Sequence, residues 1–500
     1  MIGGYVKEAS EMIVPDHRHV PAMTTLDLVR FGLSMLYMAP GEALGKVQDR
    51  HDAPAVRLPA WTAPIPAIFG LRGMLLSADP AFAESVALNQ GDTLSNASGW
   101  GTALTRIGMF TRSLLQMDFD EHRYDRLLMQ QAMTPERLTS YLDQVAPKFR
   151  DAVRGLPTGD GVDMRKLFKR TNMRLVIEVF MGINLPPQEV DKVGKAFDDL
   201  VGVNTLRQTL ARRYLHRFLL SWVPAKRAAH TPDLMSQMCH ARALDGAAYS
   251  DKQIMHHMMF FLFAAHDTTT ITMTNMAYYL ALNPQWQRRA RAQAFEFPEN
   301  VTRADFDKMT ELQNIMKETL RFRTPVPALI RASIRDTDIH GYRVPRGTGI
   351  IALTWGHHTN PAIWSEPRRF DPDRFSPERA EDKDHRSKWM PFGGGVHKCI
   401  GMHFAKMQIF TVYHTLLREF TWSVDRDYVL PTLANSLMFS NGFPATVRRF
   451  DPASEGGARE FSEDQAVGWG VAPNLRPLMY LRSRRRRRED MTRSFAHGMG

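Results

Sequence analysis

The sequence predicts a mainly α-helical fold with small β-sheets, and three observations support this prediction. An apolar run over residues 254–282 continues without proline or glycine, which is typical of a long buried helix. Helical patterns also cover residues 191–222 and 305–322. Short β-like runs with glycine turn signals occupy residues 334–353, so we expect a small hairpin sheet among the helices.

Length and composition favour one large helical domain. The chain has 500 residues, of which 44% are hydrophobic, and this is enough for a sizeable core. Its two cysteines, Cys239 and Cys399, give no disulfide framework, which suits a reducing cytoplasm. Residues 1–21 lack the apolar run of a signal peptide, and the apolar stretch over 26–38 is too short to span a bilayer. We therefore expect a cytoplasmic protein without a membrane anchor.

The net charge of +11 comes partly from residues 482–488, which contain six arginines. Nucleic-acid binding is one interpretation of such a segment. A disordered basic tail is the favoured interpretation, because no aromatic stacking platform accompanies the arginines. The rest of the chain is mildly basic, which fits an acidic partner without requiring one.

The N-terminal part is predicted to alternate between helix and extended chain. Residues 1–52 contain one amphipathic helix candidate, and residues 54–66 are Pro-rich and extended, with strand-like runs after them. Residues 79–89 predict a short helix. The polar, Gly-rich stretch over 90–108 predicts a loop long enough to border a pocket.

Residues 115–128 predict a helix with an acidic first turn, in which Asp118 or Asp120 is the candidate cap. His122 and Arg126 are four residues apart, so they share one helix face. Taken alone, this stretch is also compatible with a solvated charged helix.

The middle of the chain predicts two helices within residues 146–187, joined by a turn at 155–161, and then the long helical region over 191–222. Ser250 and Gln253 form a capping-box pattern at the start of the longest helix. At ~1.5 Å per residue this helix is on the order of 45 Å long, enough to cross the whole domain.

The longest helix carries polar groups at its centre, in the order Ala264-Ala265-His266-Asp267-Thr268-Thr269. These residues, together with polar flanks, exclude a membrane span. An acid in the middle of an apolar helix is costly to bury without a purpose. The structural alternative is a helix kinked by threonine back-bonding, with an aspartate that has no chemical role.

Glu318 and Arg321 lie three residues apart on one face of the helix predicted over 305–322. This pattern is weak alone, because it often arises by chance. Residues 433–444 predict a late loop that contacts substrate. Beyond residue 450 no periodicity remains, so we expect a poorly packed or disordered tail.

A single cysteine, Cys399, follows the glycines Gly393-Gly394-Gly395 and precedes a helix-patterned run over 402–420. Glycines allow the backbone to approach something flat and bulky, and Gly401 leaves room beside the sulfur. The dipole of a helix stabilises a thiolate at its start. No second ligand follows at zinc-like spacing, so a lone metal-binding thiolate is predicted. The alternative is a Gly-rich turn with a buried structural cysteine.

This segment resembles the cysteine loop of cytochromes P450, Phe-x-x-Gly-x-(Arg/His)-x-Cys-x-Gly. The matching positions are Phe392, Gly395, His397, Cys399 and Gly401. The resemblance implies that the Cys399 thiolate is the metal ligand, to the iron of heme b, and that thiolate ligation favours O–O cleavage. It also implies that Phe392, Gly393 and Gly401 contact the cofactor.

Other segments resemble further motifs of the same family. His122 and Arg126 match its His-x-x-x-Arg helix pattern, which implies that both bind the haem propionates. Arg331, ten residues after Arg321, resembles the family's propionate-binding arginine. His397, two residues before the cysteine, is implied to face a propionate as well.

Residues 264–269 resemble the family motif (Ala/Gly)-Gly-x-(Asp/Glu)-Thr-(Thr/Ser). The resemblance implies that the Thr268 hydroxyl hydrogen-bonds dioxygen and that Asp267 supplies protons from solvent. Ala265 departs from the usual glycine, and its methyl group narrows the groove in which oxygen and water lie. The helices over 191–222 correspond in chain order to the family's mobile lid over substrate.

Glu318 and Arg321 resemble the family's Glu-x-x-Arg pair, and residues 370–375 resemble the segment that adds Arg374 to it. A buried structural network that supports folding and haem retention is implied for these three residues.

The resemblance implies a P450 fold over residues 51–450, with haem between the long helix and the cysteine loop with its following helix. Residues 1–50 would form an N-terminal segment, and residues 451–500 a basic, disordered tail. No Gly-x-Gly-x-x-Gly pattern opens a helix, so no reductase domain is fused. The chain looks most similar to the soluble bacterial branch near the sterol demethylases.

The implied function is a haem-thiolate monooxygenase that hydroxylates an apolar, lipid-, sterol- or terpene-like substrate with O2. Two electrons would arrive from a separate ferredoxin or flavodoxin-type donor, with its reductase, at a basic face that includes Lys398. A haem-thiolate sensor would not need the pair Asp267 and Thr268, and a peroxygenase would replace it. Nucleic-acid binding through the arginine tail is not expected, although it is compatible with the enzyme.

Overall fold

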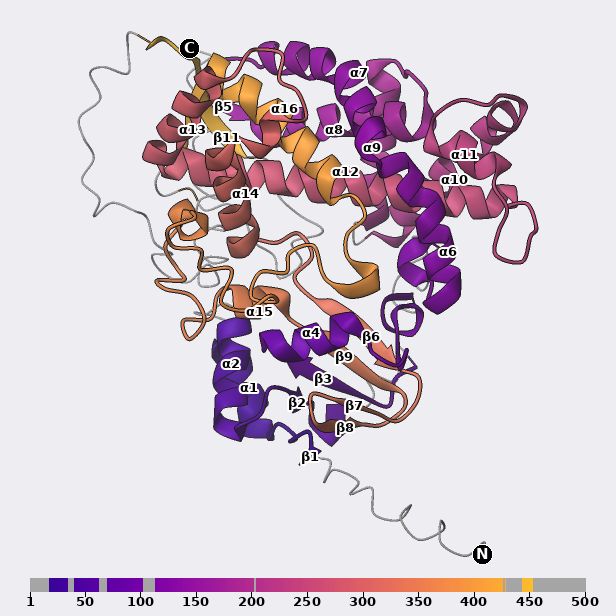
Figure 1. Cartoon of the computed structure of the whole chain (residues 1–500), viewed down its shortest axis with the longest axis vertical. Helices are drawn as coiled ribbons and strands as arrows, with labels where there is room; N and C mark the ends of the chain where they lie inside the picture. Colours follow the sequence, from indigo (N-terminus) through magenta and orange to yellow (C-terminus); the bar gives the residue numbers. More distant parts are fainter. Residues whose placement is uncertain are drawn as a thin grey trace, which may run out of the picture.

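The computed structural model describes residues 18–34, 40–62, 70–101, 113–201, 204–425, 428 and 443–452. Most of the loop expected over 433–444, the arginine-rich segment over 482–488 and almost all of the expected tail lie outside these residues. In Figure 1 the larger helices form the upper body, with β5 and β11 among them, and most of the other strands gather below with α1, α2 and α4. Within the described part, no helix is long and apolar enough to cross a membrane.

Strands flank a long run of consecutive helices, α8 to α14, along the chain. The α-helices are α1 (Thr25–Ser34), α2 (Pro40–His51), α4 (Pro80–Leu88), α6 (Phe119–Gln130), α7 (Pro135–Arg154), α8 (Met164–Met181), α9 (Pro187–Val201), α10 (Thr205–Ala228), α11 (Leu234–His240), α12 (Asp251–Leu282), α13 (Pro284–Glu296), α14 (Thr310–Phe322), α15 (Thr354–His358) and α16 (Met402–Glu419). The strands are β1 (Arg18–His19), β2 (Val56–Arg57), β3 (Gly73–Ser77), β4 (Leu94–Ser95), β5 (Gly159–Asp163), β6 (Leu329–Ser333), β7 (Thr337–Ile339), β8 (Tyr342–Val344), β9 (Thr348–Ala352), β10 (Phe420–Ser423) and β11 (Pro444–Arg449).

Three small sheets accompany the helices. One has five strands in the order β2-β3-β9-β6-β4, and the other two have the orders β1-β8-β7 and β10-β11-β5. β7 and β8 form an antiparallel hairpin that pairs Ile339 with Tyr342. The hairpin predicted within residues 334–353 is confirmed, and so is the mainly helical fold with small sheets.

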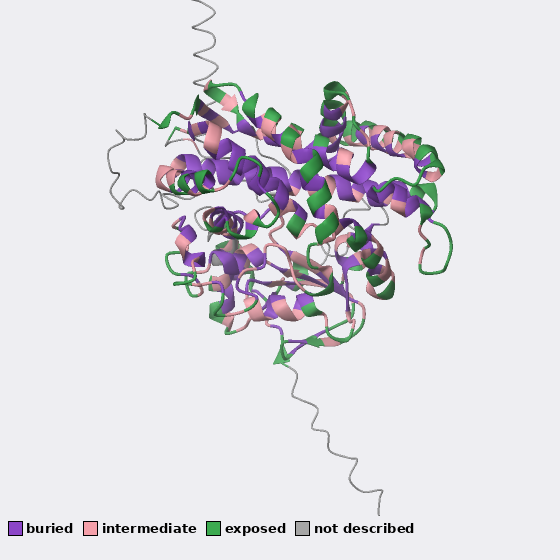
Figure 2. Cartoon of the chain, turned by 45° about the horizontal axis from the view of Figure 1, so that its top comes forward, coloured by how far each residue is buried: buried purple, intermediate pink, exposed green. Residues whose placement is uncertain are grey.

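Helix α12 forms the centre of the molecule. Its start is fixed by the predicted capping box, in which the Ser250 hydroxyl and the Gln253 side chain satisfy each other's backbone N–H groups. Most of its side chains are buried, and Figure 2 shows it as a mainly purple rod across the middle. Such a helix needs apolar neighbours on nearly every side, and α8, α10, α14 and α16 supply them.

Four boundaries differ from the sequence predictions. The N-terminal part contains two helices, α1 and α2, instead of one. The region over 191–222 is divided into α9 and α10. Residues 305–322 begin with a separate 3₁₀ turn, Asp305–Asp307, before α14. The expected loop over 90–108 contains β4 and a π-helical turn at Ala97–Gly101, because the strand β6 is available to pair with it.

Candidate active site

The cysteine loop places Cys399 just before α16. The Cys399 N–H donates to the Phe392 carbonyl oxygen over 2.8 Å, which closes the loop. The thiol is accessible to solvent, although burial is also the main cause that raises its pKa. The Cys399 thiol is thus accessible to solvent and yet surrounded by protein, as expected for a side chain that lines an internal space. The Gly401 backbone and the cations Arg126 and Lys398 oppose the shift.

The expected stabilisation of the thiolate at the helix start is present, since the Gly401 backbone lowers the pKa of Cys399, but it is not the largest effect. In the protein without a cofactor, burial outweighs the Gly401 amide and the two cations, so the pKa of Cys399 is raised rather than lowered. A bound metal cation would be the compensating charge for the thiolate.

The glycines of the loop serve two different purposes. Gly393 and Gly395 have φ values of +68° and +61°, a left-handed conformation that strains other residues. A Cβ on Gly395 would overlap the Ala87 carbonyl oxygen at the end of α4, and a Cβ on Gly394 would lie 2.9 Å from Met390 Cε. At Gly394 and Gly395, therefore, the backbone approaches other parts of the protein closely. Only Gly401 matches the expected open space, since its added Cβ meets nothing within 4 Å.

We expect Gly395→Ala to detach the cysteine loop from α4 and to destabilise the protein by several kcal/mol, about 1–2 kcal/mol of it from the left-handed backbone. Chemical unfolding measures the change. The matched control is Gly246→Ala, because Gly246 has a φ of +79° but no atom within 4 Å of an added Cβ. Equal destabilisation of the two variants would show that the contact with Ala87 is unimportant.

Four basic side chains from three parts of the chain gather beside Cys399. They are His122 and Arg126 on α6, Arg331 on β6, and His397 in the cysteine loop. The rings of His122 and His397 lie 3.8 Å apart. The Arg126 guanidinium donates to the Lys398 carbonyl oxygen over 2.7 Å. The structure thus brings all four predicted propionate-binding residues together.

The electrostatics of this cluster favour an anion. Burial, reinforced by the neighbouring arginines, lowers the pKa of His122 to about 4, and burial lowers that of Arg331 to about 10. Arg331 is 4% exposed, and its guanidinium donates to the Ile330 carbonyl oxygen. Among the described residues, no carboxylate forms an ion pair with Arg126 or Arg331, and His122 Nδ1 is buried without a partner. Carboxylates of a bound group would neutralise this cluster.

The donor set fits haem. No group of three or more His, Cys, Asp or Glu side chains within the described part of the chain is arranged to hold a metal ion. A lone accessible thiol suits a metal whose remaining ligands come from a macrocycle, and the basic cluster suits the acidic substituents of that macrocycle. Phe392 is half-buried, with its ring 6.0 Å from that of Trp389.

Asp118 is the N-cap residue of α6 and the first turn is acidic, as predicted, but the Asp118 side chain makes no capping hydrogen bond. The Asp118 carboxylate instead accepts from the Ser95 hydroxyl and, over 2.7 Å, from the Asn96 N–H. Asn96 Nδ2 lies 2.8 Å from His397 Nδ1. Asn96 is therefore a site residue that the sequence did not reveal, because its partner is 301 positions away.

On α12, a stripe of partly accessible residues interrupts an otherwise buried helix. Phe260, Ala264 and Thr268 recur every fourth residue and so share one face. The Thr268 hydroxyl donates to the Ala264 carbonyl oxygen over 2.7 Å. Ala265 is also partly buried and packs against the main core. This stripe is therefore the face of α12 that the neighbouring side chains leave partly uncovered.

The Asp267 side chain is more deeply buried than that of Thr268. Its carboxyl group is buried, and burial raises its pKa to about 7 despite the opposing charges of Arg165 and Lys169 on α8. Oδ2 has no hydrogen-bond partner among the described residues. A carboxyl group that holds a proton near neutrality suits proton transfer. The two cations of α8 had no recognisable pattern in the sequence.

Glu318 is the centre of the predicted structural network. It is fully buried with Arg321 and Arg374. Arg321 Nε donates to Glu318 Oε2 over 2.7 Å, and Arg374 Nε donates to Oε1 over 3.1 Å. The Arg321 guanidinium also reaches the His358 carbonyl oxygen, and His358 Nε2 accepts the Met390 N–H over 2.9 Å. The network thereby supports the start of the cysteine loop, a link that sequence analysis missed.

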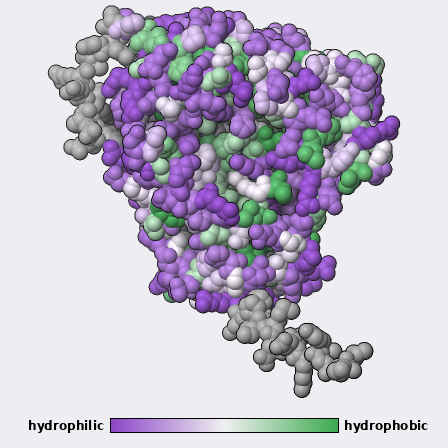
Figure 3. Space-filling view, in the orientation of Figure 1, coloured by the Kyte–Doolittle hydropathy of each residue, from purple (hydrophilic) through white to green (hydrophobic). Residues whose placement is uncertain are grey.

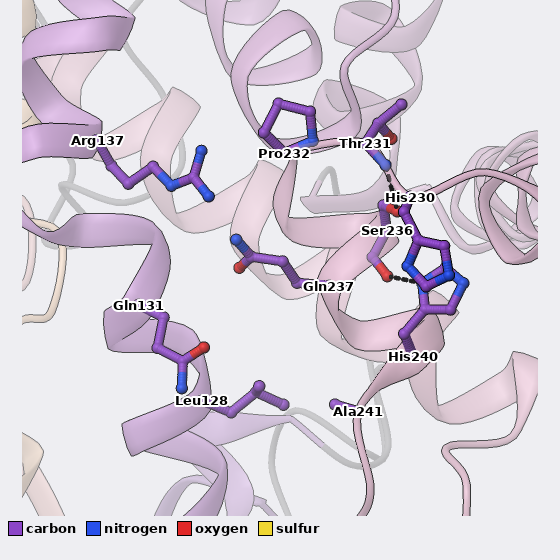
Figure 4. Close-up of a pocket in the computed structure, with 10 residues that line it drawn as sticks. All are labelled: Leu128, Gln131, Arg137, His230, Thr231, Pro232, Ser236, Gln237, His240 and Ala241. Carbon is purple, nitrogen blue, oxygen red and sulfur yellow. Dashed lines mark hydrogen bonds between the residues drawn. The ribbon is translucent and has the colours of Figure 1, made fainter.

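A separate surface pocket of about 550 Å³ lies between the α6–α7 junction and the segment around α11. Figure 4 shows Arg137 and Gln237 pointing into it, with His230 and His240 at one side. None of the predicted site residues lines this pocket. It is distinct from the site at Cys399.

Comparisons with known proteins agree with this geometry. The family model described as "Cytochrome P450" matches residues 222–444. "Putative cytochrome P450 136" of Mycobacterium tuberculosis is 34% identical over 411 residues, which cover 77% of this chain and 82% of the relative. "Putative cytochrome P450 137" of the same organism is 27% identical and covers 77% of this chain and 81% of its own length.

Solved structures show the same fold. The structure titled "Retinoic acid bound cyanobacterial CYP120A1" superposes with a TM-score of 0.71 at 20% identity, covering 81% of this chain and 94% of that one. The heme domain of cytochrome P450DA gives a TM-score of 0.72 at 19% identity, covering 87% of this chain and 99% of that one.

Proposed function

Because the chain belongs to the cytochrome P450 family, whose members are heme b monooxygenases, we propose that Cys399 ligates the haem iron and that His122, Arg126, Arg331 and His397 bind its propionates. The single observation that carries this assignment is the accessible thiol beside a basic cluster in which, among the described residues, neither Arg126 nor Arg331 forms an ion pair with a carboxylate. Phe392, Gly393 and Gly401 complete the proposed cofactor contacts.

When bound, haem would supply the oxidising chemistry, in which one atom of O2 enters a substrate C–H bond and the other leaves as water, with two electrons and two protons consumed. The chain supplies the ligand, the proton path and the shaped space. We assign the proton supply to Asp267, whose pKa of about 7 lets it both hold and release a proton near neutrality. The Thr268 hydroxyl is the group that positions O2 and passes protons to it.

The proposed substrate is apolar. Phe260, Ala264 and Thr268 present mostly apolar surface to the internal space, and Phe263 is also partly accessible. No charged side chain contributes to this stripe of α12. Helices α9 and α10 pack against each other, and α10 packs against α12, so they are placed to cover substrate as a lid. A lipid-, sterol- or terpene-like molecule fits such a lining.

The proposed electron donor is a ferredoxin or flavodoxin-type protein that docks beside the cysteine loop. Lys398 is exposed there, next to the exposed apolar residues Leu127 and Val396. A basic group beside apolar side chains suits an acidic partner that binds transiently. In Figure 3 the visible face is mostly hydrophilic, with small hydrophobic patches between. We further propose residues 51–450 as the haem domain and the cytoplasm as its location.

We expect Thr268→Ala to uncouple electron consumption from product formation, because the hydroxyl that guides protons is lost. Peroxide released per NADPH oxidised, in a reconstituted system, should rise severalfold, because one positioned proton-transfer group contributes roughly 10²–10⁴-fold to its step. The control is Thr272→Ala, since the Thr272 hydroxyl makes the same type of bond, to the Thr268 carbonyl oxygen over 2.9 Å. Unchanged peroxide release in Thr268→Ala would remove Thr268 from the proton path.

A further inference from the structure

Helix α6 has a second buried contact, made by Asp125 on the same buried face as His122. Asp125 lies between His122 and Arg126 in sequence and is 3% exposed. We propose that Asp125, Tyr249 and His257 form a clamp that positions α6, and with it the propionate-binding residues, relative to α12. This inference rests on the proposed propionate role of His122 and Arg126.

The three clamp residues meet from two separate parts of the chain. The Tyr249 hydroxyl donates to Asp125 Oδ1, across a sequence separation of 124 residues. His257 Nε2 lies 3.3 Å from Asp125 Oδ2. The rings of Tyr249 and His257 meet edge to face, with their centres 6.0 Å apart. Tyr249 and His257 are 2% and 0% exposed, so no bulk water competes with these contacts.

Tyr249 is itself held firmly at the start of α12. Its carbonyl oxygen accepts from the Arg227 guanidinium over 2.6 Å, and Arg227 also binds the Asp251 carboxylate over 2.7 Å. Burial and the nearby Asp125 carboxylate raise the pKa of Tyr249, so its hydroxyl remains a donor over the whole physiological pH range. The clamp therefore joins α6 to a point that α10 and α12 fix together.

Neighbouring residues of α6 join it to the cysteine loop. The ring of His122 lies 3.8 Å from that of His397, tilted by 32°, and Arg126 donates to the Lys398 carbonyl oxygen. Helix α6 is thus a strut between the loop that carries Cys399 and the helix that carries Asp267 and Thr268. A carboxylate at position 125 is costly to bury, and the hydrogen bond from Tyr249, with the His257 ring close by, makes that burial tolerable. Loss of the Tyr249 hydrogen bond would let α6 shift and would displace the propionate-binding side chains.

The test uses the purified, haem-loaded full chain and the variant Tyr249→Phe, which removes the donor and keeps the ring. We expect haem transfer to excess apomyoglobin to become about tenfold faster, the effect of one lost hydrogen bond to a charged group. We also expect the propionate-bending band of the resonance Raman spectrum to shift. A role in folding alone would not move that band.

The matched control is Tyr141→Phe, because the Tyr141 hydroxyl is also buried but has no hydrogen-bond partner among the described residues. It should leave the transfer rate and the band unchanged. If Tyr249→Phe does not fold, Asp125→Asn replaces it, since asparagine keeps the size and an acceptor for Tyr249 but loses the charge. The same two changes, smaller in size, are then expected.

A third variant, Arg126→Ala, separates the clamp from the proposed site. Faster haem loss in Arg126→Ala but not in Tyr249→Phe would refute the clamp and leave the propionate assignment standing. Unchanged haem loss in both would refute the propionate role of α6, and the clamp with it. If the clamp acts through Arg126, combining the two substitutions should accelerate haem loss less than the product of the single effects.

Discussion

Cys399→Ala is expected to abolish the thiolate-ligated spectrum and all monooxygenase turnover. The reason is geometric, because Cys239 is buried on α11 and no other thiol exists to replace the lost ligand. The absorption spectrum of the reduced protein with carbon monoxide measures the effect. The wild type should show the strongly red-shifted Soret band of thiolate-bound haem, and the variant should show none.

The chain offers an internal control for this experiment in Cys239→Ala. Cys239 is 5% exposed and packs in the main core, so its loss should cost some stability but leave the spectrum intact. A thiolate spectrum retained in Cys399→Ala would disprove the ligand assignment. A wild-type band at the position of histidine-ligated haem would mean that Cys399 is protonated or displaced in the holoenzyme.

Glu318→Gln is expected to destabilise the folded protein by about 3–5 kcal/mol, the cost of leaving buried charges without their partner. Glu318 accepts bonds from Arg321, from Arg374 and, over 2.9 Å, from the Asp371 N–H. A neutral amide cannot compensate two guanidinium groups that are 0% exposed. Chemical unfolding measures the loss of stability, and the absorbance of the purified protein measures the loss of haem.

A surface carboxylate provides the matched control for Glu318→Gln. Glu189 on α9 faces solvent and lies 3.7 Å from Lys192, so Glu189→Gln should change stability by less than about 1 kcal/mol. If Glu318→Gln were as stable as Glu189→Gln, the network around Glu318 would not support the fold. Normal stability with lost haem would mean that the network serves only the cysteine loop, through His358.

Features encoded by near neighbours in sequence were predictable. The capping box at Ser250, the extent of α12 and the β7–β8 hairpin depend on residues only a few positions apart. Their patterns are therefore visible in the sequence alone. The grouping of His122, Arg126, Arg331 and His397 was predicted only through the family resemblance. Their chemistry was visible in the sequence, but the distances between them were not.

Features that depend on distant partners were missed or misread. Gly394 and Gly395 were expected to approach the cofactor, and instead they pack against Met390 and α4. Asp118 occupies the predicted N-cap position of α6, but its side chain binds Ser95 and Asn96 instead of the helix. In both cases the residue type correctly indicated a special position. The partner of the residue, however, lies on a segment that only folding brings near.

By itself, the sequence determined the helical architecture, the family and the residues able to ligate a metal, hold a proton or bind carboxylates. Tertiary structure alone decided the electrostatic state of those residues. Burial raises the pKa of Asp267 to about 7, and it lowers the pKa of His122 to about 4. Folding also brought Asp125 close to Tyr249 and His257. The physical reason is that desolvation and long-range contact depend on how the whole chain surrounds a group, which no local pattern encodes.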